Sequence, residues 1–301
     1  MSMDHTVVLV GTEEGLYADG TPRALEDRRV DCISVAPEGI WGIVDGSGLW
    51  HEPTPREGRI VAELDDETAN CLLVTDGRVL VGASGASVFE LVGGELVRMR
   101  TFDEAPGRLD WYTPWGGPPD IRSMAAGPDG IVYVNVHVGG VVRTTDGGGT
   151  WTDTLDIHAD VHQVLADPEH PGRAYAATAR GLAVTSDGAD TWEFTTAGLD
   201  HSYCRAVARS DASVFVSASQ GPGGGKAALY QLAPGGARLQ RCTDGLPEWF
   251  STNLDTFCVG ARSGTVVAGD ADGTVHVSDD DGATWQVIAQ GLPAIRCVAV
   301  A

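Results

Sequence analysis

The chain has 301 residues, 43% of them hydrophobic and 21% charged, which is the composition of a globular protein with a full core. Its formal net charge of −22 leaves no basic stripe to neutralise phosphates, which argues against nucleic acid and anionic membrane surfaces as partners. Forty glycines and fifteen prolines between short apolar runs predict many strands, many tight turns and little helix.

The beginning of the chain and the cysteines indicate a cellular compartment. The only apolar run near the N-terminus, at 6–10, is too short for a signal peptide or a membrane span. The six cysteines stand singly in strand-like runs, without the Cys-x-x-Cys spacing of a zinc site. We therefore expect a cytoplasmic, monomeric protein with reduced cysteines and no membrane association.

An alternating run of about eight residues recurs seven times along the chain. In chain order the runs lie at 30–37, 69–76, 121–128, 161–168, 204–211, 254–261 and 295–301. Each is followed by a second strand-like run and a turn, so that one unit holds three or four strands in about 43 residues. Four-stranded units of this period are typical of propeller blades, and the sequence predicts an all-β, seven-bladed β-propeller as a single domain, 1–301.

The last unit is split between the two ends of the chain. Its first run, 295–301, is continued by the strand-like residues at 5–20. Pairing of the N- and C-terminal strands would close the ring and remove the open edges of an unclosed array. A pair of β-sandwiches, the alternative architecture, would not explain the constant period.

Three octets, at 144–151, 185–192 and 278–285, follow the pattern Ser/Thr-x-Asp-x-Gly-x-Thr-Trp, with Ala189 replacing the glycine in the second. They resemble the Asp boxes of sialidases, sortilin-type receptors, photosystem assembly factors and other BNR-repeat propellers. The resemblance implies turns between the third and fourth strands, on the face opposite the usual ligand site. Because the Asp can accept backbone N–H groups while the Trp packs beneath the turn, we interpret the box as a structural staple rather than a calcium or phosphate loop.

The second position of every run is polar or charged, whereas neighbouring positions are mainly apolar or small. We call these seven residues the polar ring: Asp31, Asn70, Arg122, His162, Arg205, Asp255 and Arg296. They should meet where the innermost strands begin, and buried groups there must be paired, solvated or used. Two interpretations stay open. In the first, salt bridges among these residues plug the channel. In the second, a small anion such as a carboxylate or phosphate is bound by Arg122, Arg205, Arg296 and Asn70.

Further candidates lie on the same face. His137, His162, Asp31 and Asp255 are candidate catalytic residues, with a histidine as general base. A zinc, copper or iron site would instead use four histidines on neighbouring blades: His137, His158, His162 and His201. Trp111, Tyr112 and Trp115, in the insertion at 110–120, either form a wall of the substrate-binding pocket or pack over the outer blade edge.

Two functions follow from these patterns. The first is a small-molecule-binding propeller that acts as a hydrolase or lyase on an anionic substrate at the channel mouth. The alternative is a non-catalytic protein-binding or assembly module, as in the photosystem assembly factors. Sialidase activity is not expected, because the Arg-Ile-Pro motif of sialidases is absent and those enzymes have six blades.

Overall fold

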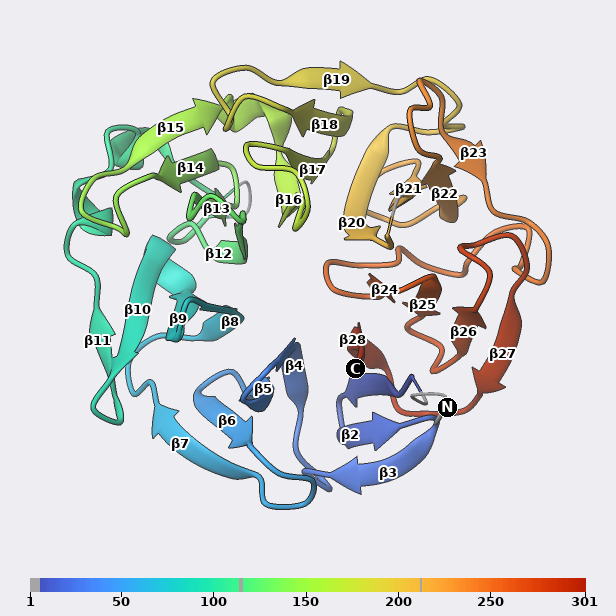
Figure 1. Cartoon of the computed structure of the whole chain (residues 1–301), viewed down its shortest axis with the longest axis horizontal. Coiled ribbons are helices and arrows are strands. Elements are labelled where there is room, and N and C mark those ends of the chain that lie inside the picture. The colour runs from blue at the N-terminus through green and yellow to red at the C-terminus, as the bar shows by residue number, and fades with distance from the viewer. Residues whose placement is uncertain (1–5, 114–115, 212) are drawn as a thin grey trace.

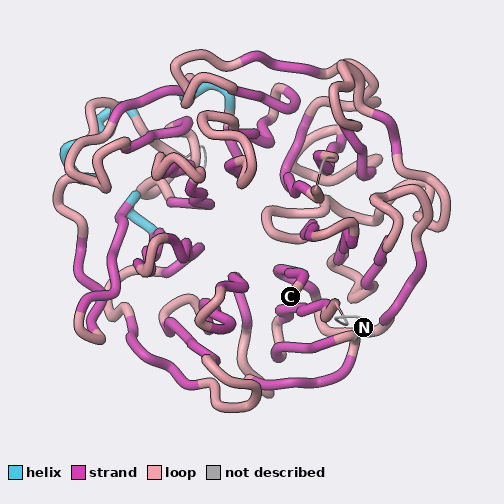
Figure 2. The backbone as a smooth tube through the Cα atoms, in the orientation of Figure 1, coloured by secondary structure: helices cyan, strands magenta, loops and turns pink. Residues whose placement is uncertain are grey.

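The strands form seven four-stranded antiparallel sheets arranged in a ring around a central axis (Figure 1). This computed structural model describes residues 6–113, 116–211 and 213–301. Figure 2 shows strands joined by loops, with helix only in short segments. None of the helices in the described ranges is long and apolar enough to cross a membrane. The predicted all-β, seven-bladed propeller is therefore confirmed.

Each blade runs from an innermost to an outermost strand. The blade built from both chain ends contains β28 (Ile295–Val300), β1 (Val8–Thr12), β2 (Gly15–Ala18) and β3 (Thr21–Ala24). The next blade contains β4 (Val30–Ala36), β5 (Gly39–Val44), β6 (Gly48–Glu52) and β7 (Arg59–Glu63). It is followed by the blade of β8 (Ala69–Thr75), β9 (Arg78–Ala83), β10 (Ser87–Val92) and β11 (Glu95–Arg98). The following two contain β12 (Ile121–Ala126), β13 (Val132–Val136), β14 (Gly140–Thr144), β15 (Thr152–Leu155); and β16 (Val161–Ala166), β17 (Ala174–Thr178), β18 (Gly181–Thr185), β19 (Glu193–Thr195).

The last two blades contain β20 (Tyr203–Arg209), β21 (Val214–Ser219), β22 (Ala228–Leu232), β23 (Gln240–Arg241); and β24 (Val259–Arg262), β25 (Thr265–Gly269), β26 (Val275–Ser278), β27 (Gln286–Ala289). The short 3-10 helices are η1 (Ser84–Ala86), η2 (Phe102–Glu104), η3 (Arg108–Asp110) and η4 (Ile157–Ala159). One strand differs from the expected pattern: the run predicted at 254–261 becomes regular strand only at Val259.

The ring is closed by pairing between the first and last strands. β1 lies antiparallel to β28, with Val8 opposite Val300 and Val10 opposite Val298. Two further backbone hydrogen bonds join Val7 and Ala301, with N–O distances of 3.2 and 2.9 Å. The predicted closure by both chain ends is thus present, and β28 is the innermost strand of its blade (Figure 1).

The hydrophobic core lies between the faces of neighbouring blades. Ile121 of β12, for example, is fully buried and packs against the β8 blade. A Cβ atom at Gly82 would lie 2.4 Å from the Cγ2 atom of Ile121, so glycine is required for this close approach. All six cysteines are free and buried within these layers, and burial raises the pKa of the Cys32 thiol to about 12.

The three octets form turns with one common hydrogen-bond pattern. In the first, which joins β14 to β15, Asp146 accepts hydrogen bonds from the N–H of Thr150 (2.9 Å) and from the hydroxyls of Thr144 and Thr150 (both 2.8 Å). The Thr144 hydroxyl in turn accepts from the N–H of Gly148 at 2.9 Å. The equivalent bonds from Thr191 lower the pKa of Asp187 to about 2. These turns join the third and fourth strands, at the blade ends away from the starts of the innermost strands.

Removing residues 295–301 tests the closure. The deletion takes away the innermost strand of one blade and exposes the edge of β1, so we expect insoluble protein or the loss of a cooperative thermal transition. Solubility, size-exclusion chromatography and thermal melting against the full chain provide the measurement. A soluble, monomeric and cooperatively folding truncation would contradict this role of β28.

Candidate functional site

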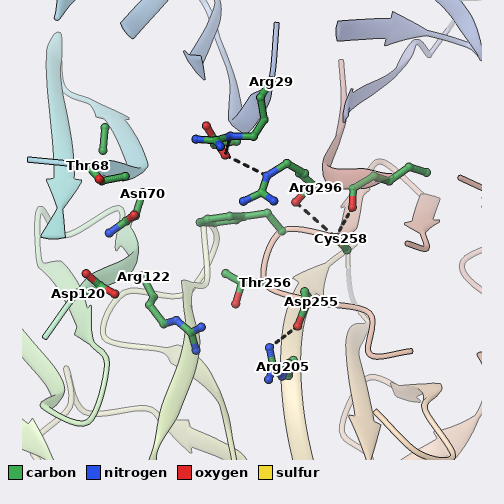
Figure 3. Close-up of a pocket in the computed structure, with 14 residues that line it drawn as sticks. Arg29, Thr68, Asn70, Asp120, Arg122, Arg205, Asp255, Thr256, Cys258 and Arg296 are labelled. Carbon is green, nitrogen blue, oxygen red and sulfur yellow. Dashed lines mark hydrogen bonds and ion pairs between the residues drawn. The ribbon is translucent and has the colours of Figure 1, made fainter. Parts of the chain in front are cut away.

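A cavity of about 380 Å³ lies at the centre of the ring, where the innermost strands begin (Figure 3). We call it the central cavity. Six of the seven polar-ring residues line it: Asp31, Asn70, Arg122, Arg205, Asp255 and Arg296. Its other polar lining residues are Arg29, Thr68, Asp120 and Thr256. The inference that the polar ring converges at the channel mouth thus matches the geometry.

A segment before β24 crosses the channel and bounds this cavity. The Thr256 hydroxyl donates to the carbonyl of His162 in β16 at 3.1 Å, and the Phe257 N–H donates to the side-chain oxygen of Gln163 at 3.1 Å. On the other side, the Phe257 carbonyl accepts from the N–H of Val298 in β28 at 2.8 Å. In Figure 1 the loop before β24 reaches into the middle of the ring. The crossing segment, 254–258, therefore links two blades that are not neighbours.

Phe257 explains why this run does not form a strand. Its φ of 65° is left-handed, a conformation that interrupts an extended chain and is costly for a bulky residue. Its side chain is partly buried against two hydrophobic clusters, one around Cys32 and Cys71 and the other around Leu9 and Val30. Phe257 thus packs against the innermost strands of several blades. Among the described residues, it is the one aromatic residue that lines the cavity.

One part of the polar ring is internally paired. The side chain of Asp31 is only 7% exposed, and its Oδ1 atom lies 2.8 Å from Nε of Arg29 and 2.9 Å from Nε of Arg296. Its Oδ2 atom accepts the N–H of Gly46 at 2.9 Å, and Arg296 also pairs with Glu13 at 2.9 Å. This corner agrees with the plug interpretation, because each charge has an opposite partner.

A second pair lies across the cavity (Figure 3). Arg205 forms an ion pair with Asp255, whose side chain is 55% exposed. The guanidinium of Arg205 also lies over the ring of Tyr203, 5.4 Å from its centroid. This pair is more open than the Asp31 pair, so water and ligands can reach the Asp255 carboxylate.

Arg122 differs from the other arginines of the ring. It lines the cavity but makes no hydrogen bond or ion pair with any residue in the described ranges. Burial and the like charge of Arg205 lower the pKa of its guanidinium. Beside it, burial raises the pKa of Asp120, although the charges of Arg122 and His137 oppose this shift. No carboxylate of the described residues thus lies within ion-pairing distance of Arg122, although the negative charges of Asp255 and Asp160 act on its guanidinium from further away.

The histidine of the polar ring points elsewhere. His162 is 0% exposed, and its Nδ1 donates to the carbonyl of Cys204 at 2.6 Å. The neutral ring consequently has its lone pair on Nε2, which lies 3.6 Å from Asp160, while Nε2 of His137 lies 3.5 Å from the same carboxylate. Burial lowers the pKa of His162 to about 4. The catalytic candidates His162 and His137 are thus buried side chains that do not line the cavity.

The four histidines proposed as metal ligands are not brought together. His158 is exposed and His201 lies 6.5 Å from the ring of Trp249, away from the buried pair. Across the described ranges, the one compact group of three metal-ligating side chains is Asp167, Glu169 and His170, at the opposite end of the strands. Asp167 and Glu169 already pair with Arg209, at 3.2 and 2.6 Å. The four histidines of the expected zinc, copper or iron site thus do not form one compact group in the described part of the chain.

The aromatic insertion also differs from its expected role as a pocket wall. Trp111 is only 6% exposed and packs against Phe102, with ring centroids 5.7 Å apart. Tyr112 is exposed but does not line the central cavity. Trp115 lies outside the described residues. The alternative, packing against the blades, applies to Trp111, because its apolar ring gains more from the core than from a polar cavity.

A second column of residues, two positions before the polar ring, was missed. Arg29, Thr68 and Asp120 line the cavity and stand at i−2 from Asp31, Asn70 and Arg122. Asp160 and Tyr203 hold the same position before His162 and Arg205. Except for Tyr203, these residues lie just before the innermost strands, whose register shifts at the polar-ring position, so the signal in the sequence is the constant offset of two residues from the ring.

The two acidic residues of the ring should differ in their effect on stability. Asp31→Ala removes two hydrogen bonds, from Gly46 and Arg296, and the ion pair with Arg29 from a buried corner, and should lower the free energy of unfolding by about 1–3 kcal/mol. Asp255→Ala removes an exposed pair and should cost no more than about 1 kcal/mol. Urea unfolding of both variants measures the difference. Equal costs would contradict the division into a paired corner and an open side.

Comparison with known proteins supports the fold. No protein-family model and no curated protein matches the chain. Among solved structures, a putative 6-phosphogluconolactonase from Bacteroides uniformis has a TM-score of 0.67 and 14% identity, covering 99% of this chain and 100% of its own. A GH74 xyloglucanase from Xanthomonas campestris has a TM-score of 0.63 and 13% identity over 94% of this chain and 46% of its own. The present chain thus spans about half the length of that enzyme.

A third similar structure is YCF48 bound to a D1 peptide, with a TM-score of 0.60 and 14% identity over 88% of this chain and 85% of its own. Two of these proteins carry the names of enzymes and the third holds a peptide, so the likeness concerns the fold alone. The structure and these likenesses identify the chain as a seven-bladed β-propeller.

Proposed function

We propose that the protein binds a small anionic molecule in the central cavity, with Arg122 as the main contact. The single observation that carries this proposal is the Arg122 guanidinium, which lines the cavity without a hydrogen bond or ion pair to the described residues. Leaving a half-buried cation unpaired is costly, and a bound carboxylate or phosphate would remove this cost.

The charges around the cavity favour an anion over a cation. Four arginines line it (Arg29, Arg122, Arg205 and Arg296), against three aspartates (Asp31, Asp120 and Asp255). Burial also raises the pKa of Asp120, because it disfavours the negative form of this carboxyl group. The local excess of positive charge contrasts with the net charge of −22 for the whole chain.

A catalytic role as a hydrolase or lyase is a second part of the proposal, and Asp120 is the observation that favours it. Its carboxyl group lines the cavity beside Arg122, and burial raises its pKa, which is a feature of carboxyl groups that exchange protons with a substrate. We therefore propose Asp120, in place of His137 and His162, as general acid or base for a substrate held by Arg122.

The non-catalytic alternative remains a distinct proposal with its own signature. A protein-binding module would use the same face without a preference for small anions. The exposed Leu109 and Tyr112, on the insertion between β11 and β12, would suit such a contact. Failure of every small anion to bind would favour this function over the first.

Replacing Arg122 tests the binding function. Arg122→Gln should weaken the binding of gluconate, used as a probe carboxylate, by at least about tenfold, because a charge-assisted hydrogen bond is lost. Arg100→Gln is the matched control, since it removes the same charge from a side chain that is 80% exposed outside the cavity. Isothermal titration calorimetry measures both. Equal affinities for the two variants would contradict the role of Arg122.

The pH dependence of binding tests Asp120. Because its pKa is raised, Asp120 loses its proton at a higher pH than an ordinary aspartate and then repels a bound anion. Gluconate affinity should therefore fall as the pH rises through the raised pKa of Asp120, above the range in which an ordinary aspartate loses its proton. Asp120→Asn should remove this decrease. An identical pH profile for the variant would exclude Asp120 as the titrating group.

A further inference from the structure

We infer that the ligand of the central cavity is a polyhydroxylated anion, such as a sugar acid or a sugar phosphate. This inference rests on the proposed function and adds the chemistry of the uncharged part of the ligand. We draw the inference from the residues that line the cavity around Arg122. Together these residues offer a ligand both hydrogen-bond acceptors and hydrogen-bond donors.

The acceptors lie on the crossing segment. The Asp255 carboxylate pairs with Arg205 through Oδ1, and its Oδ2 atom makes no hydrogen bond with the described residues. Thr256 uses its only hydroxyl proton on the carbonyl of His162, so its oxygen can offer the cavity nothing but lone pairs. Both residues line the cavity (Figure 3). They need ligand groups that donate, and hydroxyls are such groups.

A simple inorganic anion would not match this arrangement. Phosphate or acetate could satisfy Arg122, but phosphate would turn its remaining charged oxygens toward the lone pairs of Asp255 and Thr256, and acetate would offer them only a methyl group. The resulting repulsion is absent when hydroxyl groups lie between the anionic group and the crossing segment. The combination of one free guanidinium with nearby acceptors therefore points to an anion that carries its own donors.

An apolar or aromatic acid would not match it either. The apolar lining consists of four of the residues around the cavity: Ala69, Phe257, Cys258 and Ile295. The remaining lining residues are charged, amide or hydroxyl side chains, which would lose hydrogen bonds to water beside an apolar ligand. Phe257 supplies one aromatic surface, enough for one face of a sugar but without a second wall for a base or an aromatic ring.

The volume of the cavity sets the size of the ligand. About 380 Å³ corresponds to a dozen or so water molecules at roughly 30 Å³ each. A six-carbon sugar acid or sugar phosphate has a similar number of non-hydrogen atoms. Thr68, Asn70 and Asp120 line the side away from the Asp255 pair and would meet further hydroxyls (Figure 3).

Titration calorimetry on the full chain tests the inference with five probes. Gluconate and glucose 6-phosphate carry hydroxyls and a charge, acetate and inorganic phosphate carry only the charge, and glucose carries only hydroxyls. We expect at least one of the first pair to bind tenfold or more tightly than each of the other three. A stronger response to gluconate would assign a carboxylate, and a stronger response to glucose 6-phosphate a phosphate.

Two variants of Thr256 refine the test. Thr256→Val keeps the shape but removes the acceptor, and should weaken the hydroxylated anion at least threefold without weakening phosphate binding. Thr256→Ser keeps the hydroxyl and should bind like the wild type. Melting curves of both variants establish that each is folded, and the five-probe comparison on the wild type stands without them.

The outcomes separate this inference from the proposed function. If acetate or phosphate binds as tightly as its hydroxylated counterpart, and Arg122→Gln weakens both, the anion site stands and the polyhydroxylated ligand is overturned. If none of the charged probes binds, the proposed function itself fails. If glucose alone binds, the cavity recognises sugars without using Arg122, which overturns both.

Discussion

Convergence at the axis is the constraint on which this structure depends. Seven innermost strands begin around one narrow channel, so their first side chains share a small space from which water is partly excluded. Polar groups in that space must find partners, because an unpaired buried charge is costly. The pairing of β1 with β28 maintains the convergence, since an open ring would let the strands separate and expose sheet edges.

The charged residues of the polar ring are compensated to different degrees in two parts of the ring. Around Asp31 the charges neutralise one another, with two arginines and a backbone N–H on a single buried carboxylate. Around Arg122 no carboxylate of the described residues forms an ion pair, and Asp120 and Asp255, which also line the cavity, act on the guanidinium only through their charge. Both parts of the ring line one cavity, which the crossing segment bounds, because Phe257 bonds to Gln163 on one side and to Val298 on the other. The plug and the site are therefore different parts of one ring.

Periodicity made most of the fold and half of the site predictable. Repeats about 43 residues apart indicate seven blades, and one position per repeat locates the polar ring. The repeat spacing could not predict which residues of the polar ring form ion pairs with one another. These ion pairs depend on the conformation of loops such as the one that carries Asp255. The repeat spacing also failed at Phe257, whose left-handed backbone ends an alternating run that resembles the others. The histidines were misplaced because burial beside Asp160 and the carbonyl of Cys204 turns them away from the cavity.

The central claim is that the mouth of the channel is an anion site organised by Arg122. The most direct measurement is a crystal structure of the wild-type protein soaked in selenate at high concentration, with anomalous scattering used to locate the anion. The present account predicts an anomalous peak in the central cavity within hydrogen-bonding distance of the Arg122 guanidinium. A cavity without a peak, with Arg122 instead paired to a carboxylate of the protein, would contradict it.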